Sequence, residues 1–321
     1  MSNKTFLDLV DSEHSVRLDR ILSKLESCFK LERELSLLKH NIASNTLNAE
    51  LYEFLDDDDS LKTVLKGIPY KDTSTMSQEA VDEYNLIRMK CVDEAMEGVI
   101  SKINAFIISL WHAFLDWLDD WFDTNKRLNF RLKQRERHVV EKPMAYGSDE
   151  QFNNAIGYCF IYNTEWKVML HAVNQLSALL ETVSANNPEG WLNRNHSKLA
   201  QGLAEFGYEV TDTTVRYDNP KYVRIERKIG VGGGGWSKSI YTTNLGVARN
   251  MLDTERSSRT AFLAIRRTFD RVSRAEATDS DKIAMVKLVK ACKAVKMGAA
   301  LLARAIYDIG SIALRNVGSS I

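Results

Sequence analysis

The sequence predicts a mainly α-helical protein of amphipathic helices and helical hairpins, with a small antiparallel β element near residues 208–243. Apolar side chains recur at helical spacing along most of the 321 residues. The chain holds only 4 Pro and 16 Gly, so few residues interrupt helices. Alternating β-branched and aromatic residues are confined to one stretch. A hydrophobic content of 44% excludes a mainly disordered chain and supplies a sizeable core.

Residues 1–66 are expected to form an acidic helical region. A helix should begin near Ser12, because Leu18, Ile21 and Leu25 follow the spacing of one helix face. Four consecutive carboxylates, Asp56–Asp59, come later. They repel one another and cannot all face one ion, so an exposed loop or helix end is predicted rather than a metal site.

Residues 75–142 are expected to form a long aromatic amphipathic helix, starting near Thr75 and ending near Phe122, and then a basic helix, NFRLKQRERH. The uncharged run 104–115 has 12 residues, whereas a membrane span needs about 20. We therefore predict no transmembrane helix, and the N-terminus has no apolar core of signal-peptide length. The aromatic face is a candidate contact with a partner or, less favoured because of its acidic opposite face, a membrane. Its residues are Trp111, Phe114, Trp117 and Trp121.

Residues 148–250 are expected to form an α+β region. A helix should run from about Ser148 to Leu180, and a shorter one from His196 to Phe206. Strands are predicted in EVTDTTVRYDNP, KYVRIERKIG and WSKSIYTT, with the loop Gly230–Gly235 before the last of them. That loop lacks the Gly-Lys-Ser/Thr ending of a phosphate-binding loop and precedes no predicted helix, so a hinge or surface loop is predicted.

Residues 251–321 are expected to form a basic helical hairpin. The chain has no net charge, but residues 1–125 hold 13 basic and 24 acidic side chains, and residues 221–321 hold 19 and 8. This polarity indicates contact with nucleic acid or head-to-tail self-association, although both ends could simply be solvated helix faces. The candidate DNA contacts are Arg256, Arg259, Arg266, Arg267, Arg271, Arg274, Lys287, Lys290, Lys293 and Lys296.

No catalytic, cofactor-binding or metal-binding residue is predicted. The six histidines show no metal-ligand spacing, and the four cysteines lie far apart without a CxxC pair. No GxSxG motif surrounds a serine. An intracellular enzyme with a site in residues 190–245 stays open as an alternative, because sequence cannot pair distant carboxylates.

The order of features resembles the internal head proteins of large tailed bacteriophages. The resemblance covers residues 1–140: a helical start, the aromatic segment INAFIISLWHAFLDWLDDWFDTNKRL and the basic segment NFRLKQRERH. It implies a non-enzymatic virion structural protein, assembled in the host cytoplasm and located inside the phage head. Its implied partners are other virion proteins and packaged double-stranded DNA, with self-association. Family members are cleaved after Glu, which makes Glu79 in Ser-Gln-Glu a candidate processing site; the glycine-loop hairpin matches nothing in the family.

Two further hypotheses compete with this one. A membrane-active or ejected protein would act through the tryptophan-rich helix 99–122. A scaffold without a ligand would use the two charge poles for self-assembly.

Overall fold

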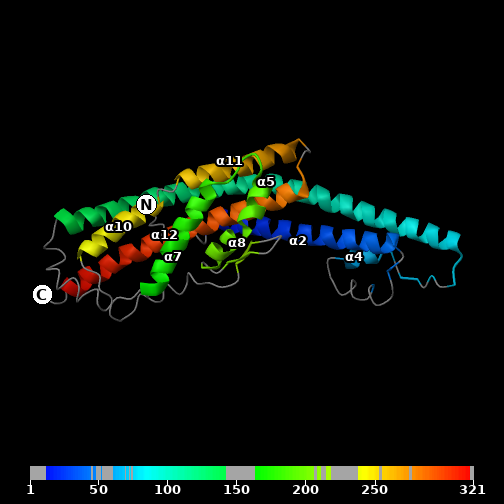
Figure 1. The fold of residues 1–321 in the computed structure, drawn as a ribbon, viewed down its shortest axis with the longest axis horizontal. Coiled ribbons are helices and arrows are strands. Elements are labelled where there is room, and N and C mark those ends of the chain that lie inside the picture. The colour runs from blue at the N-terminus through cyan, green and yellow to red at the C-terminus, as the bar shows by residue number, and fades with distance from the viewer. Residues whose placement is uncertain are drawn as a thin grey trace. The chain divides into compact units, whose positions relative to one another are not determined.

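A computed structural model describes most of the chain and is mainly α-helical, as the sequence predicts (Figure 1). The helices are α2 (Glu13–Ala43), α4 (Lys62–Leu65), α5 (Gln78–Glu141), α7 (Asn163–Glu181), α8 (Pro188–Ala204), α10 (Lys238–Leu252), α11 (Glu255–Ser273) and α12 (Asp279–Gly318), and the strands are β1 (Tyr208–Val210) and β2 (Val215–Tyr217). The described residues are 12–44, 46–47, 52, 61–68, 70–71, 73, 75–141, 163–205, 208–210, 215–217, 238–252, 255–274 and 277–318.

The chain forms two compact units. Unit 1 comprises residues 1–18 and 111–321, and unit 2 comprises residues 19–110. Helices α2 and α5 each contribute residues to both units. Each unit is described by itself below.

Unit 2 is built on the apolar faces of α2 and α5. The α2 side chains at helical spacing are buried, as the sequence predicts, and so are those of α5 that share their unit. The Nζ atom of Lys39 on α2 lies 2.5 Å from a carboxylate oxygen of Asp93 on α5. Lys24 lies over the ring of Phe106, 5.5 Å from its centroid. The buried residues include Leu22, Leu25, Leu35, Leu38, Val92, Ile103 and Ile107.

Helix α5 is one continuous helix of 64 residues, and this corrects the expected end near Phe122. No Pro or Gly lies between Phe122 and Glu141, so the aromatic helix continues into the basic segment. The helix starts at Gln78, where the hydroxyl of Ser77 accepts a hydrogen bond from the amide of Ala80 at 3.3 Å.

Helix α12 is the core of unit 1. It packs against α7, α8, α10 and α11, and Figure 1 shows it running among these helices. Residues 284–289 and 291–300 are buried without interruption. Each run is longer than one helical turn of 3.6 residues, so the helix is covered around its whole circumference.

Helix α8 begins earlier than its sequence pattern predicts. Asn187 caps the helix, because its side-chain oxygen accepts a hydrogen bond from the amide of Gly190 at 2.7 Å. Pro188 occupies the first turn, where a missing N–H costs no hydrogen bond. The expected start at His196 is therefore wrong by about two turns.

The small β element predicted over 208–243 is described only in part, and its strand KYVRIERKIG lies outside the described residues. Strands β1 and β2 pair antiparallel, with Glu209 opposite Arg216. The expected strand WSKSIYTT is wrong, because α10 begins at Lys238. Within α10, Tyr241, Leu245 and Ala248 are buried at the spacing of one helix face. The Gly230–Gly235 loop and the start of the 148–180 helix lie outside the described residues.

Replacing Gly202 with alanine is expected to destabilise the protein by about 1–3 kcal/mol, because α7 and α8 approach closely there. An added Cβ would lie 2.6 Å from Cδ2 of Leu176, and both residues are buried. The matched control is Gly246→Ala in α10, where a Cβ meets nothing within 4 Å. Its expected effect is a gain of up to about 1 kcal/mol from helix propensity. Urea unfolding followed by circular dichroism measures both, and equal effects would contradict the close helix contact.

Candidate nucleic-acid interface

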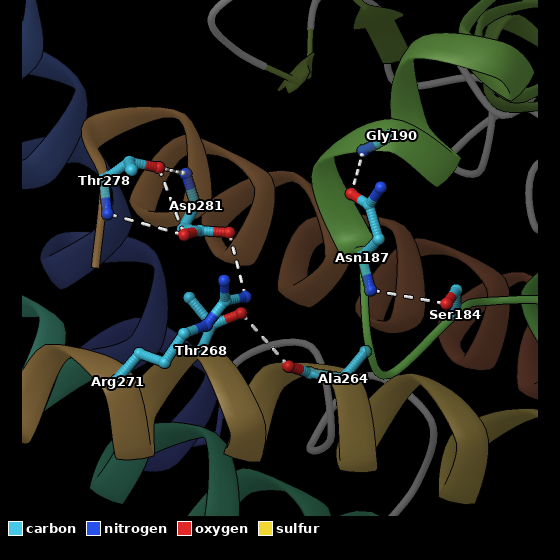
Figure 2. Close-up of polar contacts among 8 residues, drawn as sticks. All are labelled: Ser184, Asn187, Gly190, Ala264, Thr268, Arg271, Thr278 and Asp281. Carbon is cyan, nitrogen blue, oxygen red and sulfur yellow. Dashed lines mark hydrogen bonds and ion pairs between the residues drawn. The ribbon is translucent and has the colours of Figure 1, made fainter. Parts of the chain in front are cut away.

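The α11–α12 turn is held by a partly buried polar network (Figure 2). The amide of Asp281 donates to the hydroxyl of Thr278 at 3.2 Å, and the amide of Thr278 donates to the Asp281 carboxylate at 3.4 Å. This reciprocal pair caps α12, and the Thr278 hydroxyl also donates to the same carboxylate at 3.1 Å. The same carboxylate forms an ion pair with Arg271 of α11 at 2.9 Å. Arg271 is therefore held inside the hairpin rather than offered to a phosphate.

Helix α11 presents the exposed arginines of unit 1's hairpin. Three of its candidate DNA contacts, Arg259, Arg266 and Arg267, are exposed and fall within about 100° of the helix circumference. They extend over about eight positions, or roughly 12 Å along the axis. Asp270 is the one exposed acid among the described α11 side chains. Arg274, also exposed, follows directly after Ser273, the last residue of α11, and these four side chains are together called the α11 arginines.

Arg256 also belongs to α11, but its side chain lies outside the described residues. Its position in the helix sequence places it between Arg259 and Arg267 on the helix circumference. It therefore stays a predicted contact.

The α12 lysines, which the sequence predicts as candidate DNA contacts, are buried or half-buried in the structure. Lys287, Lys293 and Lys296 are 6%, 5% and 2% exposed, and Lys290 is half-buried. Neighbouring helices cover them, so the first three cannot reach a DNA phosphate in this fold. The structure defines the contacts of two of these lysines. The Lys296 Nζ atom lies over the ring of Trp121 at 4.8 Å, and Lys293 donates to the carbonyl oxygen of Ser15 at 3.4 Å.

The aromatic side chains of α5 that the sequence predicts as partner or membrane contacts are buried in the structure. Trp111 is 8% exposed, and Phe114, Trp117 and Trp121 are 1% exposed or less. Trp111 lies against two rings of α11, those of Phe262 and Phe269, with centroid separations of 5.1 and 5.2 Å. The aromatic side chains thus join α5 to the rest of unit 1.

One stretch of α5 is long and apolar enough to cross a membrane, judged by length and composition alone. A helix in the core of a water-soluble unit passes the same test. The stretch that passes this test is 39% buried in the structure.

Glu79 lies in the first turn of α5 and is exposed. Its side chain is open to a protease, and cleavage there stays a prediction. Across the described ranges no three His, Cys, Asp or Glu side chains gather in a way that could hold a metal ion. The alternative of an enzyme site in residues 190–245 stays untested, because much of that range lies outside the described residues.

Burial raises the pKa of the Cys292 thiol to about 12, and the nearby Lys296 offsets part of that rise. At pH 8 the thiolate fraction of such a group is about one in ten thousand. Labelling of Cys292 by iodoacetamide should therefore be at least about a hundredfold slower than labelling of half-buried Cys91 in the folded protein, and unfolding should remove the difference. Peptide mass spectrometry measures both rates. Equal rates in the folded state would contradict a closed core around α12.

The same thiol links stability to pH. Its folded pKa lies above the value of 9.0 for an unperturbed thiol. The stability that this group contributes is therefore present below pH 9 and is lost as the pH rises toward 12.

No protein-family model, curated protein or solved structure matches this chain. A function has to be argued from the chemistry of the residues. The sequence pattern predicts the α11 arginines and the α12 lysines alike as DNA contacts. The small and branched residues between the lysines make α12 apolar on every side, and this pattern indicates that the lysines are buried.

Proposed function

We propose that this protein is a non-enzymatic structural component of the virion interior that contacts packaged double-stranded DNA through α11. The observation that carries the proposal is the exposed set of α11 arginines, formed by Arg259, Arg266 and Arg267 on the helix and Arg274 directly after its end. The resemblance of residues 1–140 to phage internal head proteins supplies the setting. Other virion proteins are the remaining proposed partners.

The chemistry of the α11 face suits a polyanion. Arginine presents five N–H donors in a planar fork that matches phosphate oxygens. A helix that lays three arginines along roughly 12 Å, with a fourth directly after its end, can contact several phosphates of one duplex without reading its bases. Binding of this kind is independent of sequence and releases counterions, so it weakens steeply with salt. Such contact suits a protein enclosed with DNA of any sequence.

The proposal confines DNA contact to α11 within the hairpin. Arg271 is occupied by Asp281, and the described lysines of α12 are buried or half-buried. The C-terminal charge excess therefore has two roles: the α11 arginines face outward, and the α12 lysines lie among core helices.

The test is DNA binding by the full chain across a salt series, with the four α11 arginines replaced by glutamine. Each phosphate contact contributes about 0.9 to the slope of log affinity against log salt, so the slope should fall by about 3–4. The matched control removes four exposed basic side chains of unit 2, which the proposal leaves away from DNA. These are Arg20, Arg33, Lys90 and Lys102.

The wild type and the control should bind with the same slope, and the α11 variant should lose most of its affinity at low salt. Equal losses in the two variants would mean that only net charge matters and would overturn the α11 assignment. No binding by the wild type at low salt would overturn the DNA proposal as a whole. Helical circular dichroism checks that each variant is folded.

A further inference from the structure

Within unit 1, α5 carries a second charged surface. It belongs neither to the core of the unit nor to the proposed DNA contact. Six exposed residues recur at alternating spacings of four and three. They fall within about 80° of the helix circumference, on a stripe roughly 27 Å long. We call this surface the α5 stripe: it consists of Asp119, Asp123, Lys126, Phe130, Lys133 and Arg137.

The α5 stripe is open to a partner. Phe130 is 60% exposed, which is unusual for a large aromatic side chain in the middle of a helix. Asp123 and Lys126 lie 3.8 Å apart within the helix, but their side chains are 69% and 79% exposed. An ion pair so exposed contributes little, so it would not hold the two side chains away from a partner.

The charges of the stripe are ordered along the helix. The acids occupy its N-terminal end and the bases its C-terminal end. If a second α5 lies antiparallel with its midpoint also at residue 128, each stripe position meets one of opposite character. Asp119 faces Arg137 of the second copy, and Asp123 faces its Lys133. Phe130 faces the stem and ammonium of its Lys126, a cation–π arrangement.

All three pairs follow from a single register, and the two-fold axis produces each of them twice. The contact is therefore isologous, with the same surface used by both copies. A parallel pairing in register would instead place Asp119 against Asp119 and Lys133 against Lys133, which like-charge repulsion disfavours. Of these two arrangements, only the antiparallel one gives every stripe residue a partner of opposite charge or a cation–π partner.

We propose that the α5 stripe is a self-association surface and that its occupant is the α5 stripe of a second copy of this chain, antiparallel and centred on residue 128. The surface is on a different helix from the α11 arginines, so the proposal does not depend on DNA binding. Because its contacts are mostly exposed ion pairs, the association is weak and salt-sensitive. It suits a protein that is crowded with copies of itself.

Charge reversal and exchange in the full chain test the register. Sedimentation equilibrium at low salt should show a wild-type dimer that weakens as salt rises. Asp119→Arg places two arginines together and should weaken dimerisation at least about tenfold. Adding Arg137→Asp in the same chain restores opposite charges at both ends, and the dissociation constant should return to within about threefold of the wild type.

Glu94→Arg is the matched control. It makes the same charge change at an exposed position of α5, but the proposed register pairs it with position 162, beyond the end of the helix. It should leave dimerisation unchanged. A wild type that stays monomeric up to about 100 μM, a loss in Glu94→Arg equal to that in Asp119→Arg, or a folded double variant that stays monomeric would each overturn the proposal.

Discussion

Trp117→Ala is expected to destabilise unit 1 by about 3–5 kcal/mol, one of the largest single-residue effects in this chain. The Trp117 side chain is fully buried, and its ring is stacked on Phe114 with centroids 6.0 Å apart. Its indole nitrogen has no hydrogen-bond partner among the described residues. The loss is therefore one of apolar burial and packing, with a cavity left between core helices.

Urea unfolding of the full chain, followed by tryptophan fluorescence and circular dichroism, measures this loss. Ile108→Ala is the comparison on the same helix, because its side chain is 42% exposed, and it should cost less than about 1.5 kcal/mol. A small effect at Trp117 would contradict its place in the core. It would also revive the hypothesis that the tryptophan-rich helix acts on membranes, which binding of the wild-type chain to anionic and neutral vesicles would then test.

Asp281→Ala is expected to cost about 3 kcal/mol, because it leaves Arg271 without its counter-charge and removes one half of the α12 capping pair. The side chains of Asp281 and Arg271 are 7% and 27% exposed, so water replaces the lost partner only in part. Figure 2 shows that this one carboxylate connects the cap of α12 to α11. The loss should therefore loosen the hairpin as well as the helix end.

A double-mutant cycle separates the ion pair from the cap. Arg271→Met together with Asp281→Ala should cost less than the sum of the two single changes, because neither charge is then left alone. Asp270→Ala, an exposed acid on α11, should cost less than about 0.5 kcal/mol. Additive effects at Arg271 and Asp281 would show that the ion pair contributes nothing and that the cap alone accounts for the loss.

The sequence predicts where helices form and which face is apolar better than it predicts how the helices pack. The spacing of Leu18, Ile21 and Leu25 correctly predicts the buried face of α2. The predicted start of that helix near Ser12 is confirmed as well, since the Ser12 hydroxyl accepts a hydrogen bond from the amide of Ser15 at 3.1 Å. The periodic pattern of the aromatic segment likewise predicts which face of α5 is apolar. Periodicity works here because it depends only on the geometry of a single helix.

The errors occur where local patterns are ambiguous. WSKSIYTT alternates well enough to indicate a strand, yet the same Tyr241 starts a helical series that continues through Leu245. A strand and a short helix cannot be separated by alternation over eight residues, and the surrounding helices decide in favour of α10. The predicted boundary near Phe122 failed for a related reason, since a change in charge is not a change in backbone preference.

The order of the amino acids is enough to establish that this chain is helical, that its acidic and basic residues lie at opposite ends, and that its aromatic segment has one apolar face. Which basic residues face water depends instead on how the helices pack. Arg266 and Lys293 are indistinguishable as positive charges in a sequence, but one is exposed on α11 and the other is 5% exposed on α12. The physical reason is that exposure depends on how many neighbours surround a helix, and a long aliphatic stem lets lysine lie in a core where its ammonium finds a partner.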